Sequence, residues 1–462
     1  MENMMEKIVS LCKRRGFVFP ASEIYGGFAN SYAYGPYGSE LKKNIKDLWW
    51  KKFVHSRENM VGIDGPIILH PKLWEASGHT TNFNDALVDC KECKKRFRAD
   101  HIVEEATGED MEGRLDDMKN VLDEKIKCPV CGKKNWTEVR NFNMMFQTKL
   151  NTTDDEKDSV AFLRPETAGA IFIEFKNVLD STRQKIPFGI AQIGKAFRNE
   201  IVAGNFIFRL REFEQMEIEY FISPEEKWEE LFEKWLVEQE EFAMALGAKR
   251  EDIRRYEHPK EKLSHYSKKT IDIEYKFPFG GFKELFGLAH RGDFDLSQHA
   301  KFSGQKLEYF DAEKNERYVP HVLEPTFGLD RSILVSLLAA YTEEKVGEDI
   351  RVVMKFPNAV APVKVAVFPL MKNKPELVGK AREIFDSLKN KFVCEFDDNG
   401  NVGKRYRRQD EIGTPYCVTV DFDSLEKGDV TVRDRDTMEQ ERVKIEELES
   451  FFSEKFKVYP VK

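Results

Sequence analysis

The chain has 462 residues, of which 41% are hydrophobic and 33% charged, and its net charge is −8. This length predicts two or three domains, and the longest apolar runs are too short for a membrane-spanning helix, so we expect a soluble intracellular protein. Because the net charge is negative, a nucleic-acid partner would require a local basic surface.

The first elements expected along the chain are two helices and a broken strand. Residues 1–17, MENMMEKIVSLCKRRGF, are typical of a charged amphipathic helix rather than of a signal peptide. Residues 38–55 place apolar side chains from Leu41 to Phe53 at helical spacing, with a basic opposite face. The following segment, MVGIDGPIILHP, predicts a strand that Pro66 interrupts.

Four of the seven cysteines form two Cys-x-x-Cys pairs. Cys90 and Cys93 lie in DCKEC, and Cys128 and Cys131 lie in KCPVCGKKNW. Two such pairs can supply four thiolates to one tetrahedral Zn²⁺, and four protein ligands would make that metal structural rather than catalytic. Residues 94–127 would then fold as a small subdomain between the pairs. Free thiols in a reduced cytosol and a redox pair are the alternatives.

A hairpin is predicted around residues 196–217, AFRNEIVAGNFIFRLREFEQME. Its turn is surrounded by Arg198, Glu200, Arg209 and Phe213. A guanidinium can hold a phosphate oxygen, a glutamate can accept a hydrogen bond from an exocyclic amine, and a phenylalanine can cover a purine. The pattern therefore suits a nucleotide, and cross-strand salt bridges are the structural alternative.

Helices and strands alternate beyond the hairpin. A long helix is expected to begin at Ser223, with Pro224 at its first position and Glu226 completing a capping box. The segments TIDIEYKFPFGGFKELFGLAH and RYVPHVLEPTFG predict strands. The segment GLDRSILVSLLAAYTEE predicts a helix that continues through Glu344.

A linker that contains prolines lies near residues 356–362, and the pattern of predicted elements changes after it. About 100 residues of regularly alternating strand and helix follow, an ordinary size for a small α/β domain. Within it, GKRYRRQDEIG concentrates basic side chains around one tyrosine. Basic residues with an aromatic suit phosphate contact and base stacking, whereas a solvated helix face is the alternative.

These motifs together resemble the three signatures of class II aminoacyl-tRNA synthetases. FRNE followed by RLREF is similar to the second signature, EPTFGLDRSIL to the third, and the 38–55 helix with DGPIILHP to the first, dimer-forming one. Further segments, among them AYGPYGSELKKN, SGHTTNF, LRPETAGAIF and DLSQH, resemble glycyl-tRNA synthetases of the homodimeric type. The resemblance covers nearly the whole chain, and the cysteine pairs fall where that family carries an insertion.

The resemblance implies an α+β fold. A class II catalytic domain, built on an antiparallel sheet flanked by helices, would occupy residues 1–355, with a zinc-knuckle insertion at about 88–158. A C-terminal α/β anticodon-binding domain would occupy residues 356–462. The implied protein is a cytoplasmic homodimer, without a membrane partner, that uses ATP to attach glycine to tRNA(Gly) through a glycyl-adenylate. Its implied cofactors are Mg²⁺ with ATP and a structural Zn²⁺.

Roles for the nucleotide-binding residues follow from the resemblance. Arg198 would bridge the α-phosphate and the glycine carboxylate, and Glu200 would accept a hydrogen bond from the adenine amine. Phe213 would stack on adenine, while Arg209 and Arg331 would hold the outer phosphates. Arg198, Glu200 and Arg331 form the implied catalytic set. The ATP-contacting set is Arg198, Asn199, Glu200, Phe208, Arg209, Leu210, Arg211, Glu212, Phe213, Glu284, Leu285, Gly328, Leu329, Asp330 and Arg331.

The glycine, magnesium and tRNA sites are implied in the same way. Glu166 and Glu217 match the family's ammonium-binding carboxylates. Glu284 and Glu324 match acidic positions near ATP-bound Mg²⁺. Thr326 departs from the family, which usually has serine there, and its methyl group could sharpen the exclusion of alanine. The glycine-contacting set is Arg98, Glu166, Phe213, Glu214, Gln215, Met216, Glu217, Glu324, Pro325, Thr326, Phe327 and Gly328. The tRNA-contacting set is Lys404, Arg405, Tyr406, Arg407 and Arg408.

Two other functions stay open at this point. A catalytically inactive relative could keep the fold as an RNA-binding or polymerase-accessory subunit, and a related synthetase could use proline, threonine, serine or histidine. The retained ATP-binding residues argue against the first, and the glutamate pair with EPTFG favours glycine over the second. Surface or salt-bridged positions are the alternative for Glu166 and Glu217. His79 and His299 suit either a functional or a structural role.

Overall fold

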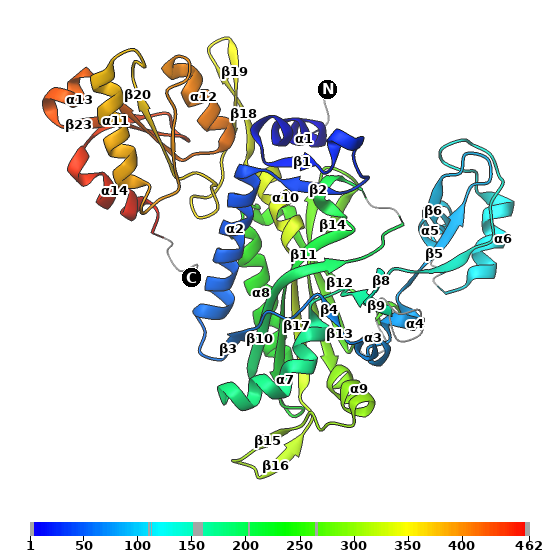
Figure 1. Cartoon of the computed structure of the whole chain (residues 1–462). Helices are drawn as coiled ribbons and strands as arrows, with labels where there is room; N and C mark the ends of the chain where they lie inside the picture. Colours follow the sequence, from blue (N-terminus) through cyan, green and yellow to red (C-terminus); the bar gives the residue numbers. More distant parts are fainter. Residues whose placement is uncertain are drawn as a thin grey trace.

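The computed structural model describes residues 4–457 except 110, 112, 151–159, 202–203 and 264–266. Figure 1 shows three parts: a central sheet with its helices, a small subdomain set apart from it, and a C-terminal domain beside the N-terminal helix. Several expectations extend outside the described residues, at 1–3 of the N-terminal helix, 151–158 of the insertion, 202–203 of the predicted hairpin and 458–462 of the C-terminal domain. Among the described helices, none is long and apolar enough to cross a membrane.

Seven strands form the central sheet in the order β12-β13-β14-β17-β11-β10-β3. Neighbouring strands are antiparallel except β10 and β3, which are parallel. The predicted antiparallel sheet flanked by helices is therefore confirmed. The strands are β3 (Met60–Gly62), β10 (Phe188–Phe197), β11 (Glu212–Ile222), β12 (Ile253–Glu257), β13 (Lys269–Phe277), β14 (Gly281–Gly292) and β17 (His321–Gly328).

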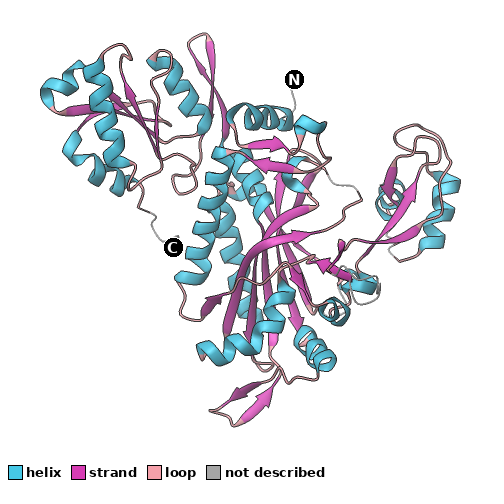
Figure 2. Cartoon of the chain, viewed as in Figure 1, coloured by secondary structure: helices cyan, strands magenta, loops and turns pink. Residues whose placement is uncertain are grey.

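Three helices cover one face of this sheet, as Figure 2 shows. They are α2 (Pro36–Trp50), α8 (Trp228–Ala245) and α10 (Leu329–Ala340). Met216 and Ile218 of β11 and Phe327 of β17 are fully buried against them. A π-helical turn, Lys51–His55, extends α2 and adds Phe53 to the same core.

Two further helices cover only part of the opposite face. They are α7 (Ala168–Thr182) and α9 (Phe294–Ser303). Phe175 of α7 packs on Phe221 of β11, with 4.5 Å between ring centroids, and Val322 of β17 joins the same core. Further along these two strands, the same face carries the polar side chains Glu217 and Thr326. The helices therefore close one end of this face and leave the other end open.

Two predicted helix boundaries are wrong. The helix expected from Ser223 begins at Trp228, because Ser223 organises a turn instead: its Oγ accepts from the Glu225 N–H at 3.3 Å. The helix expected through Glu344 ends at Ala340. Residues Tyr341–Val346 form β18, which pairs with β19 (Asp349–Met354), so strand pairing overrides the helical spacing there.

Shorter elements complete the central part. At the N-terminus, α1 (Met4–Arg15) precedes the hairpin of β1 (Val18–Pro20) and β2 (Tyr32–Tyr34). A second small sheet and two short helices lie beside the open end of the main sheet, near the insertion (Figure 1). These are β4 (Ile68–Leu69), α3 (Pro71–Ala76), α4 (His79–Asn82), β8 (Gln147–Lys149) and β9 (Val160–Leu163). The hairpin of β15 (Tyr309–Asp311) and β16 (Glu316–Tyr318) projects beyond α9.

The subdomain set apart in Figure 1 contains both cysteine pairs. It has its own core, in which Trp136 is buried and donates its indole N–H to the Ile126 carbonyl at 3.0 Å. Its elements are β5 (Asn84–Asp89), β6 (Arg96–Arg98), α5 (Ala99–Thr107), α6 (Leu115–Lys125) and β7 (Arg140–Asn143). The subdomain thus begins a few residues before the predicted position 88.

The C-terminal domain has a five-stranded sheet in the order β21-β20-β22-β23-β24. The first three strands are parallel and the last two pairings are antiparallel. α11 and α14 pack on one face, and α12 packs on the other. The elements are β20 (Val365–Pro369), α11 (Pro375–Leu388), β21 (Cys394–Phe396), α12 (Val402–Ile412), β22 (Tyr416–Val420), α13 (Phe422–Lys427), β23 (Asp429–Asp434), β24 (Gln440–Lys444) and α14 (Leu448–Lys455).

Candidate active site

A cavity of about 440 Å³ occupies the open end of the main sheet. Its walls come from β11, β13, β14 and β17, from the segment between β10 and β11, and from the start of α10. The fold thereby gathers predicted residues from distant parts of the sequence. Those that line the cavity are Arg98, Glu166, Arg198, Glu200, Phe208, Arg209, Leu210, Phe213, Glu214, Gln215, Glu217, Glu284, Leu285, Glu324, Thr326, Gly328, Asp330 and Arg331.

Strand alternation on β11 decides which of its residues reach the cavity. Gln215 and Glu217 line it, whereas Met216 is fully buried in the core on the opposite face. Glu214 reaches the cavity margin, but its carboxylate pairs with Lys42 of α2 at 2.5 Å. The Met216 side chain therefore cannot contact glycine in the cavity, and the Glu214 carboxylate serves the link to α2.

The same alternation holds on β17. Glu324, Thr326 and Gly328 line the cavity. Pro325 and Phe327 are buried on the other face, and Phe327 lies in the core beneath α2 and α8. The side chains of Pro325 and Phe327 therefore cannot contact glycine in the cavity either.

Four residues of the predicted ATP set lie outside the cavity. Leu329 is fully buried in the core of the sheet. Asn199, Arg211 and Glu212 line a second, neighbouring cavity, where Arg211 donates to the Ala29 carbonyl at 3.2 Å. Glu212 and Phe213 are consecutive residues of β11, so their side chains point to opposite faces of the sheet.

Arg198 is held among aromatic rings at the outer end of the cavity. Its guanidinium carbon lies 5.3 Å from the ring centroid of Phe213 and 5.4 Å from that of Phe83. Its Nε donates to the Pro165 carbonyl at 3.0 Å. These contacts orient a cation beside a flat apolar ring, which suits a phosphate attached to a base.

A second arginine completes this end. Arg331 Nη1 lies 2.9 Å from Glu284 Oε2, and its guanidinium carbon lies 4.6 Å from the Phe208 ring centroid. The nearby Arg331 lowers the pKa of Glu284, although burial opposes this effect. Glu284 therefore stays ionised and keeps Arg331 extended along the cavity wall.

The inner end of the cavity is acidic. Thr326 Oγ1 donates to Glu217 Oε1 at 3.1 Å, and Thr167 donates its hydroxyl to the other oxygen of Glu217. Glu324 accepts from Arg291 Nη1 at 2.8 Å, and Arg291 is also paired with Asp295. Carboxylates thus outnumber the cations that pair with them here.

The crowding of these carboxylates displaces their pKa values. Burial and the neighbouring Glu166 raise the pKa of Glu217. Burial raises the pKa of Glu324 to about 8, in spite of Arg291. Burial also opposes ionisation of Glu166, but His79, Arg291 and Arg198 together outweigh it and lower the pKa of Glu166 to about 2. A small cation placed among these groups would relieve their repulsion, so this end suits a ligand ammonium.

Two residues of this acidic end were missed by sequence reasoning. Arg291 lines the cavity, and Glu219 lies beneath its floor, within 4.8 Å of the Glu217 and Glu324 oxygens. Glu219 follows Glu217 at strand spacing, and Arg291 follows Gly287 and Ala289 in the same way, so alternation was the available signal. Neither carboxylate oxygen of Glu219 has a hydrogen-bond partner among the described residues.

Arg98 reaches the cavity from the small subdomain. Its Nη1 lies 3.2 Å from Asp85 Oδ1, and its Nη2 lies 2.5 Å from Asp100 Oδ2. Burial raises the pKa of Asp85 to about 6, although Arg98 opposes this. His299, by contrast, lies on α9, buried with its ring 6.4 Å from Phe172, and takes no part in lining the cavity.

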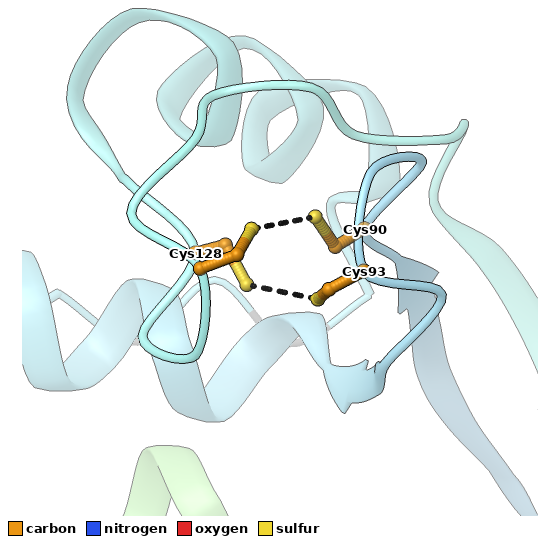
Figure 3. A group of neighbouring side chains, drawn as sticks. Cys90, Cys93 and Cys128 are labelled. Atoms are coloured by element: carbon orange, nitrogen blue, oxygen red, sulfur yellow. Dashed lines mark hydrogen bonds between the residues drawn. The ribbon is translucent and has the colours of Figure 1, made fainter.

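The four paired cysteines converge at one point, as Figure 3 shows for Cys90, Cys93 and Cys128. The sulfurs of Cys90 and Cys131 lie 3.6 Å apart, and those of Cys93 and Cys128 lie 3.7 Å apart. All four sulfurs lie within 4.8 Å of one another. A tetrahedron of thiolates at a Zn–S distance of about 2.3 Å separates its sulfurs by about 3.8 Å, so the cluster fits zinc.

The basic segment of the C-terminal domain forms part of α12. Arg405 is buried and donates to the carbonyls of Pro369, Asp398 at 3.0 Å and Gly400 at 2.7 Å. Tyr406 packs on Phe368, with 5.4 Å between ring centroids. Both residues therefore hold the domain together. The buried Arg405 side chain cannot reach tRNA, whereas the tRNA contact of the partly buried Tyr406 stays a prediction.

The other three basic residues of this segment lie nearer the surface. Lys404 is exposed, and the Arg407 side chain is 43% exposed and 3.7 Å from Asp410. Arg408 is paired with Asp397 at 2.6 Å. Lys404 and Arg407 are thus the members of the predicted set that can reach a partner without breaking a short ion pair.

Three family models match the chain. Residues 146–341 match the tRNA synthetase class II core domain (G, H, P, S and T). Residues 364–455 match an anticodon binding domain, and residues 107–144 match the glycyl-tRNA synthetase insertion domain 1. The matched core contains most of the residues that line the cavity.

Curated relatives are similar over almost the full chain. The glycine–tRNA ligase of Acetivibrio thermocellus is 54% identical over 470 aligned positions, covering 99% of each chain. The glycine–tRNA ligase of Lachnoclostridium phytofermentans is 53% identical, covering 99% of this chain and 100% of its own. That of Lachnospira eligens is 52% identical with the same coverage.

Proposed function

This chain belongs to the glycine–tRNA ligase family, and we propose that its central cavity activates glycine with ATP and passes the glycyl group to tRNA(Gly). The observation that carries this proposal is the polarity of the cavity. Its inner end carries a surplus of carboxylates, and its outer end carries arginines among phenyl rings. A molecule with an ammonium at one end, joined to a nucleotide at the other, matches that arrangement.

Glycine is proposed to bind at the inner end. Its ammonium would lie between Glu166 and Glu217, since a buried cation must be paired. Glycine offers no side chain to grip, so selectivity must come from excluding larger residues and from recognising its charged ends. Thr326 donates its hydroxyl to Glu217 and lines the cavity, where its methyl group would occupy space that a larger substrate needs.

The chemistry needs no nucleophilic side chain. A glycine carboxylate oxygen attacks the α-phosphorus of ATP, and the bond to the pyrophosphate oxygen breaks, which gives glycyl-adenylate and pyrophosphate. The terminal ribose hydroxyl of tRNA(Gly) then attacks the glycyl carbonyl and releases AMP. Arg198, held by Phe83 and Phe213, would position the α-phosphate and stabilise the charge that develops on it. Arg331 would hold the outer phosphates.

The surroundings of the two predicted magnesium carboxylates differ. Glu284 faces Arg331 at the outer end, where ATP phosphates would lie, and suits an ion bound with ATP. Glu324 is occupied by Arg291 at the inner end. We therefore assign Glu284 to the Mg²⁺ that accompanies ATP, and we assign Glu324 to the ammonium site. The ion would neutralise phosphate charge during attack.

The remaining assignments concern the molecule beyond the cavity. We propose a structural Zn²⁺ at Cys90, Cys93, Cys128 and Cys131, whose four thiolates would close the coordination shell. Residues 1–355 would form the catalytic domain, with the insertion inside it, and residues 356–462 would recognise the anticodon arm. A homodimer in the cytoplasm, where thiols stay reduced, is the proposed state of the protein.

The test is ATP–pyrophosphate exchange measured with each of the twenty amino acids. We expect exchange with glycine and background rates with the others. Exchange with proline, threonine, serine or histidine would replace the proposed substrate. No exchange with any amino acid, in protein that still binds tRNA, would favour the inactive relative instead.

A further inference from the structure

Glu166 has a contact that the proposed chemistry does not use. Its Oε2 lies 3.3 Å from Nε2 of His79, on the short helix α4. The other ring nitrogen of His79, Nδ1, lies 2.8 Å from the hydroxyl oxygen of Ser77. Serine, histidine and glutamate therefore form a row that ends at the ammonium site.

The imidazole in this row is held from several sides. Its ring centroid lies 5.5 Å from that of Trp74 and 5.2 Å from that of Phe83, both in edge contacts. The backbone of α4 is anchored too, because Asn143 Nδ2 donates to the carbonyls of His79 at 3.1 Å and Thr80 at 3.2 Å. Only 13% of the His79 side chain is exposed. Such a ring has little freedom to turn away from Glu166.

The hydrogen bond between Ser77 and His79 Nδ1 can fix which ring nitrogen of His79 carries a proton. The Ser77 hydroxyl has two acceptors in reach, His79 Nδ1 at 2.8 Å and the Trp74 carbonyl at 3.5 Å, and the first distance is that of a good hydrogen bond. When the hydroxyl donates to Nδ1, the neutral ring carries its proton on Nε2, which faces Glu166. The imidazole then acts as an N–H donor to the carboxylate.

Each carboxylate of the ammonium site has its own orienting partner. Glu217 is oriented by Thr326 and Thr167, and Glu324 by Arg291. For Glu166, His79 is the ion-pairing side chain found among the described residues. An N–H donated from His79 Nε2 orients the Glu166 carboxylate through Oε2, so that Oε1 can accept a hydrogen bond from the substrate's ammonium.

We propose that Ser77 and His79 are positioning residues that hold the Glu166 carboxylate ready for the ammonium group of glycine. This inference rests on the proposed glycine site. It predicts that loss of the donor weakens recognition of the ammonium and leaves ATP binding intact, because Arg198 and Arg331 lie at the other end of the cavity.

The experiment compares His79→Leu, His79→Gln and Ser77→Ala with the wild-type enzyme in pyrophosphate exchange. His79→Leu should raise the KM for glycine about 10- to 100-fold, the usual cost of losing a hydrogen bond to a charged group, with the KM for ATP within about twofold. His79→Gln should recover most of the loss, because its amide can place an N–H near the position of Nε2. Ser77→Ala should give a smaller increase.

Binding of two stable adenylate analogues separates positioning from folding. Glycyl-sulfamoyl-adenosine carries the ammonium, and glycolyl-sulfamoyl-adenosine carries a hydroxyl in its place. Measured by calorimetry, the affinity for the first analogue should fall in His79→Leu, and the affinity for the second should be unchanged. Thr81→Ala is the matched control, because it removes the hydrogen bond from Oγ1 to the Gly78 carbonyl in the same turn without touching Glu166.

The outcomes distinguish the inference from the proposed site. Equal weakening of both analogues, or a glycine KM in His79→Leu within twofold of wild type, would overturn the positioning role. If Glu166→Gln still impaired glycine binding in that case, the proposed ammonium site would stand alone. If Glu166→Gln also had no effect, the site itself would be misassigned. Should His79→Leu fail to fold, the comparison of Ser77→Ala with His79→Gln decides in the same way.

Discussion

Glu217 and Met216 are neighbours in sequence, yet one lines the cavity and the other lies in the core beneath α2. The strand repeat of two explains this difference, and it also separates Thr326 from Phe327 on the adjacent strand. A family motif is a contiguous run of residues, whereas only every second side chain of a strand faces the cavity. At the residue scale, the register of β11 with β17 therefore assembles the acidic end, since Glu217 lies directly opposite Thr326.

Arg198→Ala tests the assignment of the reacting centre. The substitution removes a guanidinium that Phe83, Phe213 and the Pro165 carbonyl hold in place. We expect the rate of glycine-dependent pyrophosphate exchange to fall by at least about 100-fold, the loss typical of removing one donor to a developing charge. Circular dichroism and gel filtration should show an unchanged fold and assembly.

Lys195→Ala is the control for this change. Lys195 lies near the end of β10, just before Arg198, and pairs with the exposed Glu212, so its loss should alter the exchange rate by less than about threefold. Arg198→Ala activity within threefold of wild type would remove Arg198 from the reacting centre.

Thr326 allows the hydroxyl and the methyl group to be tested separately. Thr326→Val keeps the shape but leaves Glu217 Oε1 with only the long hydrogen bond from Gln215 Nε2 at 3.5 Å, and we expect the KM for glycine to rise about 10-fold or more. Thr326→Ser keeps the donor and removes the methyl group, so glycine activation should persist while exchange with alanine increases. Unchanged glycine KM in Thr326→Val would show that this hydroxyl does not orient Glu217.

At the element scale, the sequence predicts the long strands and helices well and their ends poorly. The alternation in β10 and β11 and the apolar stripes of α2 and α8 are repeated over several turns or residues, so they specify the element type. The ends depend on contacts with other segments. Ser223 carries a cap-like pattern but organises a turn before α8, and the helical spacing up to Glu344 yields to pairing between β18 and β19.

The basic segment on α12 shows a second limit of sequence reasoning. Arg405, Gln409 and Ile412 share the buried face of this helix at spacings of four and three residues. An arginine on that face is not expected from composition, because arginine is mostly exposed. It becomes favourable only because carbonyls of Pro369 and Gly400, from two other segments, converge on its guanidinium. The local sequence around Arg405 does not predict that these carbonyls meet at its guanidinium.

For the insertion, we predict that a bound zinc ion stabilises its small core. Purified protein should contain about one Zn²⁺ per chain, and Cys128→Ser should lose it, because three thiolates bind the ion far less tightly than four. The amides around Cys90 and Trp136 should then exchange hydrogen faster, since the metal links the two ends of this small core. Elemental analysis and hydrogen-exchange mass spectrometry give the two measurements.

The matched control for the zinc site is Cys394→Ser, in β21 of the other domain. This variant should keep its metal. Protein made with ample zinc under reducing conditions, and found to contain none, would rule out the four-thiolate site.

At the scale of the whole molecule, the two large domains are joined by a buried ion pair and by further polar contacts, in addition to the linker. Arg351 of β19 is fully buried, and its Nε and Nη2 each lie 2.8 Å from the carboxylate of Asp410 on α12. Arg15 of α1 pairs with Glu411 at 2.5 Å, and the Tyr37 hydroxyl donates to Glu395 at 2.7 Å. Breaking a buried pair is costly, so these contacts hold α12 in a constant orientation to the catalytic part.

Because the two domains are distinct, tRNA binding can be tested separately from glycyl-adenylate formation. If the C-terminal domain binds only tRNA, then neutralising exposed cations on α12 should leave glycyl-adenylate formation unchanged. Lys404→Ala with Arg407→Ala is the appropriate pair, because Lys404 is exposed and Arg407 is 43% exposed. Arg405→Ala is the contrasting variant, because its buried guanidinium binds three carbonyls and its loss should destabilise the domain.

We expect the Lys404→Ala, Arg407→Ala double variant to exchange pyrophosphate at the wild-type rate and to charge tRNA(Gly) more slowly when tRNA is limiting. Its salt dependence should also weaken, by about one to two units in the slope of log KM for tRNA against log salt, because fewer phosphate contacts release fewer counterions. Both rates are measured on one preparation across a salt series. Equal loss in the two assays would indicate a folding defect, as expected of Arg405→Ala but not of the double variant. Wild-type charging with an unchanged slope would mean that tRNA does not contact this face of α12.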